Sequence, residues 1–337
     1  MHKKALERDV ISYNTVLSAC SRSEHWDLGL RMLREMREHD MDPDVISFNS
    51  AISVCERGEQ WVWALVMLTE MQEQELQPDV ISYSAMISAC AKGQRWELAL
   101  EMLAEMHEQG LKPNLISFNA AISACSKGGQ WQRAMAIFAE MQEKVLEPHV
   151  ISYSVVISSY ARGKQWERAV GMLAEMQLQL LEPNLRSYNA VIIALSTCEQ
   201  WERALGILSE MQEQHLEPDV ISINAAITAC DKGERWEQSL RMLAEMKEQG
   251  SEPDMVTFNA AMNACDKGGC RWWASLALLG EMRQTGLETS VVAYSSVVNT
   301  CKMHDEWRFA IALLRAMLCS GQDLDIMACS AASSSCE

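Results

Sequence analysis

A 35-residue repeat constrains the fold of this chain more than any other feature of its sequence. Every proline falls in one register of the repeat, and tryptophan marks a second register with one 36-residue interval, from Trp236 to Trp272. The full units are residues 10–44, 45–79, 80–114, 115–149, 150–184, 185–219, 220–254, 255–290 and 291–325. Residues 1–9 match the tail of a preceding unit, and residues 326–337 match the head of a following one. We therefore expect one solenoid domain over residues 1–337 that is part of a longer protein.

Apolar residues within a unit follow helical spacing. Tyr83, Met86 and Cys90 lie at i, i+3 and i+7, which is one stripe of a first helix. Gly93 interrupts this stripe, and a second one begins at Trp96. A hairpin of this size cannot bury both stripes alone, so neighbouring repeats must stack. The pattern predicts an all-α, right-handed superhelical α-solenoid of helix-turn-helix repeats.

The composition excludes several classes of protein. No apolar run approaches 18 residues, so we expect no membrane span. The seven histidines are scattered, and no Ser/His/Asp arrangement or Gly-rich phosphate loop is present, so we expect no enzyme activity and no cofactor. The twelve cysteines follow no secretory signal and indicate reduced thiols inside a cell. Seven of the cysteines recur at the same position of the first helices, too far apart to share a metal ion. We therefore interpret them as core residues. We interpret the regularly spaced Trp and Met residues in the same way.

The repeat resembles a known family. A typical unit, residues 45–79, reads VISFN … ALVMLTEM … QPD. This pattern is similar to that of pentatricopeptide repeats over the whole of residues 1–337. The resemblance implies single-stranded RNA binding at one base per repeat. It also implies a role in RNA processing, stability or translation beside a recruited RNA-processing enzyme, in a mitochondrion or plastid. No targeting peptide is visible in this chain.

Two residues of each repeat, the fifth and the last, read the base in that family. Here the pairs are Asn14/Asp44, Asn49/Asp79, Ser84/Asn114, Asn119/His149, Ser154/Asn184, Asn189/Asp219, Asn224/Asp254, Asn259/Ser290 and Ser295/Asp325. Ionised Asp only accepts hydrogen bonds and suits the ring N–H of uracil or guanine, whereas Asn can also donate to cytosine or adenine. Asn at the fifth residue reaches a pyrimidine, and Ser leaves room for a purine. The expected target is 5′-UUA-pyrimidine-AUUCG-3′.

Two further sets of residues are implied by the resemblance and by charge. The second residues of adjacent units would sandwich each base: Ile11, Ile46, Ile81, Ile116, Ile151, Arg186, Ile221, Val256 and Val292. Basic residues at the thirteenth position would contact phosphates: Arg22, Arg57, Lys92, Lys127, Arg162, Lys232 and Lys267.

The net charge of −17 is unusual for a nucleic-acid binder, but its distribution along the repeat is uneven. The first thirteen residues of the nine units carry nine basic and three acidic residues, a net charge of +6, which leaves −23 for the rest. This distribution predicts a basic inner stripe and an acidic outer surface. Basic residues at helix C-termini also complement the helix dipole. The alternative function is a tetratricopeptide-like scaffold whose acidic second helices bind a basic protein.

Overall fold

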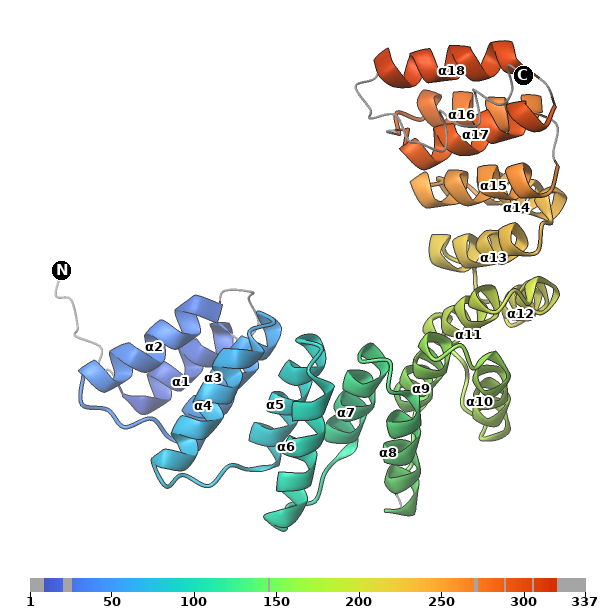
Figure 1. The fold of residues 1–337 in the computed structure, drawn as a ribbon. Helices are drawn as coiled ribbons and strands as arrows, with labels where there is room; N and C mark the ends of the chain where they lie inside the picture. The colour runs from blue at the N-terminus through green and yellow to red at the C-terminus, as the bar shows by residue number, and fades with distance from the viewer. Residues whose placement is uncertain are drawn as a thin grey trace. The chain divides into compact units, whose positions relative to one another are not determined.

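A computed structural model describes residues 9–20, 26–144, 146–269, 272–287, 289–304 and 306–319. These residues form eighteen α-helices and no strand (Figure 1). The first helices of the repeats are α1 (Val10–Cys20), α3 (Val45–Arg57), α5 (Val80–Lys92), α7 (Leu115–Lys127), α9 (Val150–Arg162), α11 (Leu185–Thr197), α13 (Val220–Lys232), α15 (Met255–Lys267) and α17 (Val291–Met303). The second helices are α2 (Trp26–Glu38), α4 (Trp61–Glu73), α6 (Trp96–Glu108), α8 (Trp131–Glu143), α10 (Trp166–Leu178), α12 (Trp201–Glu213), α14 (Trp236–Glu248), α16 (Trp272–Gln284) and α18 (Trp307–Cys319). The prediction of an all-α solenoid of helix-turn-helix repeats is confirmed.

Most first helices start at the first residue of a repeat because an Asp, Asn or Ser side chain just before it caps the helix. Asp44 has an extended backbone, with φ −98° and ψ 178°, and its side chain accepts the Ser47 N–H at 2.8 Å. The hairpin turn after a first helix contains a left-handed residue, for example Gln94 with φ 57°. The second helix α6 ends before Gly110, whose φ of 73° is the left-handed conformation that glycine adopts at little cost.

The helices pack into two compact units, residues 1–163 and residues 164–337. In the first unit, α1, α3, α5, α7 and α9 lie side by side, and each second helix packs between its own first helix and the next one, as α4 does between α3 and α5 (Figure 1). In the second unit, α11, α13, α15 and α17 form the same kind of row. The predicted stripe residues Tyr83, Met86 and Cys90 are fully buried, as are Ala99 and Met106 of the second helix. The prediction that the apolar stripes form the core is confirmed at these positions; the single continuous domain stays a prediction.

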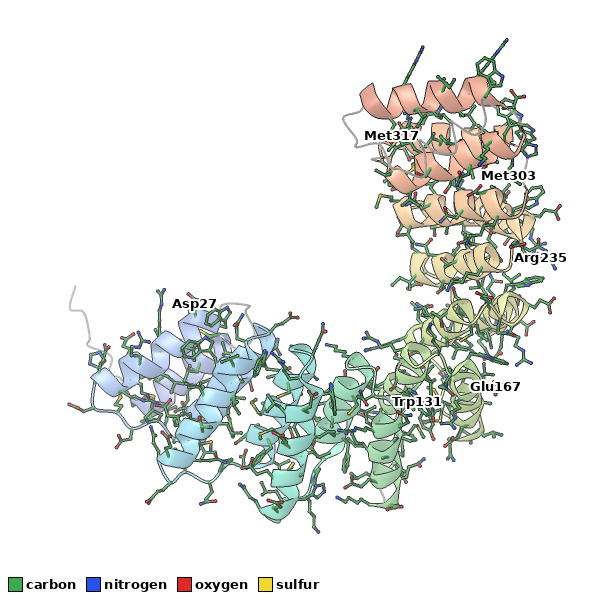
Figure 2. The ribbon with its side chains drawn as sticks, in the orientation of Figure 1. Asp27, Trp131, Glu167, Arg235, Met303 and Met317 are labelled. Carbon is green, nitrogen blue, oxygen red and sulfur yellow. The ribbon has the colours of Figure 1, made fainter. Side chains whose placement is uncertain are left out.

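The tryptophans at the start of the second helices connect adjacent repeats. A Cβ atom added at Gly93 would collide with the indole ring of Trp61 in the preceding repeat. The same relation recurs between Gly163 and Trp131, the residue labelled at the start of α8 in Figure 2. The ring of Trp131 also lies 6.0 Å from that of Tyr160 on α9. The interpretation of the Trp ladder as packing between repeats is confirmed at these positions.

The cysteine ladder is part of the core. Cys55, Cys90 and Cys125 are fully buried, and burial raises the pKa of the Cys55 thiol to about 12 and that of Cys125 to about 11. These thiols are therefore neutral at physiological pH, whereas a metal ligand must be a thiolate. In the described part of the chain, no three His, Cys, Asp or Glu side chains are grouped as metal ligands would be. None of the described helices combines the length and apolarity needed to cross a bilayer.

Candidate nucleic-acid interface

One face of the first helices carries the predicted base-sandwiching residues. Ile46 is 61% exposed, which is unusual for a large apolar residue in a protein whose stripes are otherwise buried. Residues eleven positions apart share a face of a helix with about 3.6 residues per turn, so Ile46 and Arg57 lie on the same side of α3. The exposed residues at the second position of the repeats are Ile11, Ile46, Ile81, Ile116, Ile151, Arg186, Ile221, Val256 and Val292.

A cavity lies between Ile11 and Ile46, the first two of these exposed second-position residues. It has a volume of about 560 Å³ and is lined by Ile11 and Ile46, together with Asn14, Asp44 and Ser18. Its size falls in the range of small-ligand sites. The walls are apolar and the amide and carboxylate groups supply hydrogen-bonding atoms, which is the chemistry needed to stack a flat heterocycle and contact its edge.

The fifth and last residues of a repeat are neighbours wherever they are Asn and Asp. In four repeats the Asn side chain donates through Nδ2 to Oδ1 of the Asp, with an N–O distance of 3.1 Å in each case. These pairs are Asn14–Asp44, Asn49–Asp79, Asn189–Asp219 and Asn224–Asp254. The structure thus brings together residues that are 30 positions apart in the sequence.

Where the last residue of a repeat is Asp, Asn or Ser, its side chain also caps the N-terminus of the next helix. Burial acts to raise the pKa of Asp79, but hydrogen bonds from the Ser82 backbone and hydroxyl and from Asn49 outweigh it, so the pKa lies below its ordinary value. The pKa values of the other three paired aspartates are lowered in the same way. These carboxylates are therefore ionised at neutral pH and can only accept hydrogen bonds.

Where the last residue is Asn, the cap determines which side of its amide remains available. Oδ1 of Asn114 accepts the Ser117 N–H at 2.9 Å and the Ser117 hydroxyl at 3.0 Å. Oδ1 of Asn184 makes the same two contacts with Ser187. At Asn114 the carbonyl oxygen is used at the helix end, so the Nδ2 donor is the part of the amide that the cap does not use. The cap therefore leaves an acceptor at Asp and a donor at Asn.

The remaining pairs depart from this arrangement. His149 does not cap α9; its Nδ1 lies 3.2 Å from the Ser152 hydroxyl, and Oδ1 of Asn119 is buried without a hydrogen-bond partner among the described residues. In repeat eight, the Ser290 hydroxyl donates to Oδ1 of Asn259 at 3.1 Å. The two residues of the fifth pair, Ser154 and Asn184, belong to different units. In the ninth pair, Ser295 lies on α17 and Asp325 lies outside the described residues. Arg22, one of the predicted phosphate-contacting residues, also lies outside them.

The sequence reasoning missed a third residue of this site, the hydroxyl side chain at the third position of the next repeat. The Ser82 hydroxyl is fully buried and lies 2.5 Å from Oδ1 of Asn49 in the preceding repeat. Ser117 makes the corresponding contact with Ser84, at 2.7 Å between the two hydroxyl oxygens. A signal was present in the sequence, since Ser or Thr occupies the third position of every full repeat except the ninth, which has Ala293.

Two of the predicted phosphate-contacting residues are engaged in ion pairs. Lys92 lies 3.2 Å from Glu56, and Lys267 lies 2.9 Å from Asp231; in both cases the acid belongs to the preceding repeat. The count of charged residues along the repeat included these acids only in the net charge. It could not show that each of them neutralises a particular lysine in the next repeat. The other described members of this set, Arg57, Lys127, Arg162 and Lys232, are the last residues of α3, α7, α9 and α13.

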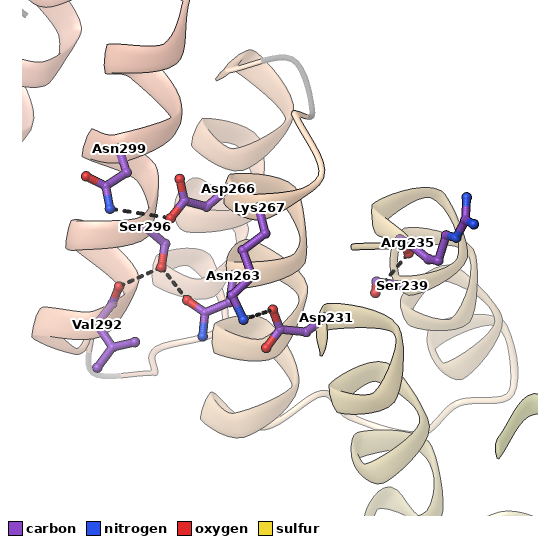
Figure 3. Close-up of polar contacts among 9 residues, drawn as sticks. All are labelled: Asp231, Arg235, Ser239, Asn263, Asp266, Lys267, Val292, Ser296 and Asn299. Atoms are coloured by element: carbon purple, nitrogen blue, oxygen red, sulfur yellow. Dashed lines mark hydrogen bonds and ion pairs between the residues drawn. The ribbon is translucent and has the colours of Figure 1, made fainter. Parts of the chain in front are cut away.

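A polar network surrounds Lys267 on α13, α15 and α17. Figure 3 shows Lys267 beside Asp231, and Asn299 donating to Asp266 at 3.4 Å. Burial raises the pKa of Asp266, and the hydrogen bond from Asn299 and the charge of Lys267 only partly oppose this effect. The face of these three helices is therefore less basic than the count of lysines predicts.

Comparison with known proteins identifies the repeat. The model described as "Pentatricopeptide repeat domain" matches residues 66–128, 171–233 and 206–267, and two further models, "PPR repeat family" and "PPR repeat", match residues 8–57 and 113–162 and residues 46–76 and 151–179. The chain belongs to the pentatricopeptide repeat family. A search of the curated proteins finds no match for this pentatricopeptide repeat chain.

Solved structures of other pentatricopeptide repeat proteins resemble the chain. The crystal structure of PPR10 from maize is 23% identical with a TM-score of 0.59, over 97% of this chain and 52% of PPR10. PPR10 in complex with an 18-nt psaJ RNA element is 21% identical with a TM-score of 0.49, over 97% of this chain and 51% of the other. The PPR domain of Arabidopsis thaliana protein-only RNase P 1 in complex with tRNA is 17% identical with a TM-score of 0.45, over 51% of this chain and 90% of the other. The likeness to maize PPR10 shows a shared fold, and the chain spans about half of the length of that protein.

Proposed function

We propose that this chain binds single-stranded RNA through its first helices, with one nucleotide at each repeat. The proposal rests mainly on the cavity between Ile11 and Ile46. There these two exposed side chains flank the hydrogen-bonded pair of Asn14 and Asp44. A base stacked between the two isoleucines would present its edge to the amide and the carboxylate. Family membership supports the same function.

The preferred sequence follows from the polar atoms that the caps leave available. Ionised Asp beside Asn suits uracil, because the carboxylate accepts from the ring N3–H and the amide donates to a carbonyl oxygen. Asn beside Ser suits adenine, because Nδ2 can donate to the bare ring nitrogen. The proposed target is 5′-UUA-pyrimidine-AUUCG-3′. We place this activity in organellar RNA processing, stability or translation, carried out by binding and by a recruited processing enzyme rather than by chemistry of the chain itself.

Binding of the purified chain to three oligonucleotides tests this function. The nine-letter RNA is compared with its complement and with the DNA of the same sequence. We expect the nine-letter RNA to bind most tightly, because the bases of the complement do not match the nine pairs and the DNA lacks the 2′-hydroxyl groups by which a protein distinguishes RNA. Equal affinity for all three would contradict the proposal.

Salt dependence separates RNA binding from the alternative scaffold function, in which acidic second helices bind a basic protein. RNA bound through several phosphates should lose affinity as salt rises, with a slope of log affinity against log salt of roughly −0.7 for each phosphate contacted. A flat response for the nine-letter RNA would favour the scaffold.

A further inference from the structure

The third-position hydroxyl group of one repeat contacts the base-reading amide of the repeat before it. Thr257 Oγ1 lies 2.6 Å from Oδ1 of Asn224, and Ser47 Oγ lies 2.6 Å from Oδ1 of Asn14. The two partners are 33 residues apart in each case, so the contact joins adjacent repeats. Both hydroxyl-bearing side chains are fully buried.

The hydrogen atoms around Thr257 can be assigned from its neighbours. Its oxygen accepts the backbone N–H of Asp254 at 3.1 Å, so its single hydroxyl hydrogen is free to be donated. The carbonyl oxygen of Asn224, at 2.6 Å, is nearer than the carboxylate oxygen of Asp254, at 2.8 Å. The hydroxyl therefore donates to the Asn224 amide, while Nδ2 of that amide donates to Asp254 at 3.1 Å.

These two contacts fix the orientation of the amide. A rotation of the Asn224 amide by 180° would place its carbonyl oxygen against the Asp254 carboxylate, which cannot donate, and would leave that carboxylate as the only acceptor near the hydroxyl hydrogen. In the observed orientation one hydrogen of Nδ2 bonds to Asp254 and the second remains available. A base that offers an acceptor at this point satisfies it, as the O4 carbonyl of uracil does, whereas the N4 amino group of cytosine does not.

We propose that this third-position hydroxyl is a specificity-determining positioning residue: it holds the carbonyl oxygen of the preceding Asn so that the amide donates to the base, and thereby sets the preference for uracil over cytosine at that repeat. The inference rests on the proposed RNA-binding function. It assigns to Ser47, Ser82, Ser222 and Thr257 a role beyond helix capping.

Repeat four shows what happens when the hydroxyl is diverted. Ser152 lies beside Nδ1 of His149 instead of bonding to Asn119, and the Asn119 carbonyl oxygen is left buried without a partner among the described residues. Because no hydroxyl of the described residues donates to this carbonyl oxygen, no such hydrogen bond holds the amide in one orientation. Leaving the buried acceptor unsatisfied is also unfavourable. The fourth letter should accordingly accept uracil and cytosine about equally.

The substitution Thr257→Val tests the proposal because valine has nearly the shape of threonine without its hydroxyl. Affinity is measured for two nine-letter RNAs that carry U or C at the seventh position. We expect the ratio of the two affinities to fall about fivefold in Thr257→Val, the effect of one neutral hydrogen bond, and to be restored in Thr257→Ser. Thr300→Val on α17 is the matched control, because Thr300 is also buried but donates to the backbone of Ser296 at 2.8 Å; it should leave the ratio unchanged.

The result distinguishes this inference from the function on which it rests. If the unmodified chain prefers U at the seventh position and Thr257→Val keeps the same ratio, the hydroxyl has only a structural role and the inference is wrong. If the unmodified chain shows no preference among the RNAs, the proposed function fails and the inference fails with it.

A gain of specificity at repeat four provides a second test that does not depend on the folding of Thr257→Val. His149→Asp should release Ser152 to bond with Asn119 and raise the preference for U over C at the fourth letter severalfold. In the double variant His149→Asp with Ser152→Ala, the preference should be smaller. Equal preferences in the single and double variants would overturn the proposal.

Discussion

The Asp79 carboxylate, which ends a repeat, uses its Oδ1 atom for the contacts of the fold. Oδ1 of Asp79 accepts the Ile81 and Ser82 N–H groups, both at 2.9 Å, and the Asn49 amide at 3.1 Å. These contacts orient the carboxylate within the protein itself. Helix capping and the proposed base recognition are thus linked at a single residue, so we expect substitutions there to change both stability and specificity.

The lowered pKa of Asp79 predicts how acid affects the fold. A carboxylate whose folded-state pKa lies below its ordinary value stabilises the fold above the ordinary value and loses that contribution as pH falls through the folded one. Asp79→Asn keeps a capping oxygen but cannot titrate. We expect the variant to lose less unfolding free energy than the unmodified chain between pH 7 and pH 3, measured by urea denaturation. Identical losses would show that this carboxylate makes no pH-dependent contribution.

At the scale of the hairpin, Gly93 is needed more for the packing of Trp61 than for the conformation of the turn. The left-handed residue of the turn is Gln94 with φ 57°, whereas Gly93 has φ −74°, which any residue can adopt. What Gly93 provides is space for the Trp61 ring of the preceding repeat. Arg95 covers the same ring, with its guanidinium carbon 4.8 Å from the ring centre. The turn is therefore a contact between repeats as well as a connection within one.

Alanine in place of Gly93 should destabilise the chain by about 1–3 kcal/mol, because its methyl group would overlap with Trp61. Gly206 in α12 is the control, since an added Cβ there meets no atom within 4 Å. Gly206→Ala should stabilise the chain by about 0.5–1 kcal/mol through the better helix propensity of alanine. Urea denaturation of both variants measures the difference, and a Gly93→Ala variant as stable as the unmodified chain would contradict this account of the turn.

The helices were predictable because their pattern is contained within one repeat. The apolar stripe of Tyr83, Met86 and Cys90 and the interruption at Gly93 follow from local spacing, and the observed ends of α5 and α6 agree with them. Contacts that join one repeat to the next were not predictable in this way. The bond of Ser82 to Asn49 and the ion pair of Lys92 with Glu56 depend on how far one hairpin is displaced from its neighbour, and that displacement is a property of packing.

At the scale of the whole chain, each repeat is proposed to read one of a series of successive bases. Neighbouring repeats share residues: Asp79 of one repeat caps the first helix of the next, and Ser82 of that next repeat bonds to the Asn49 amide of the one before. The family resemblance supplied the two base-reading positions. The roles of the shared residues became visible only when adjacent hairpins were placed side by side, as with Ser117 between Ser84 and Asn114.

Selection of RNA from a random pool by the unmodified chain and by Asn114→Asp shows whether each repeat reads a single base. The substitution keeps an oxygen to cap α7 but replaces the Nδ2 donor with a carboxylate acceptor. We expect the third letter of the selected sequence to change from A towards G while the other letters stay the same. An unchanged third letter, or a change spread over all letters, would contradict the reading of one base by each repeat.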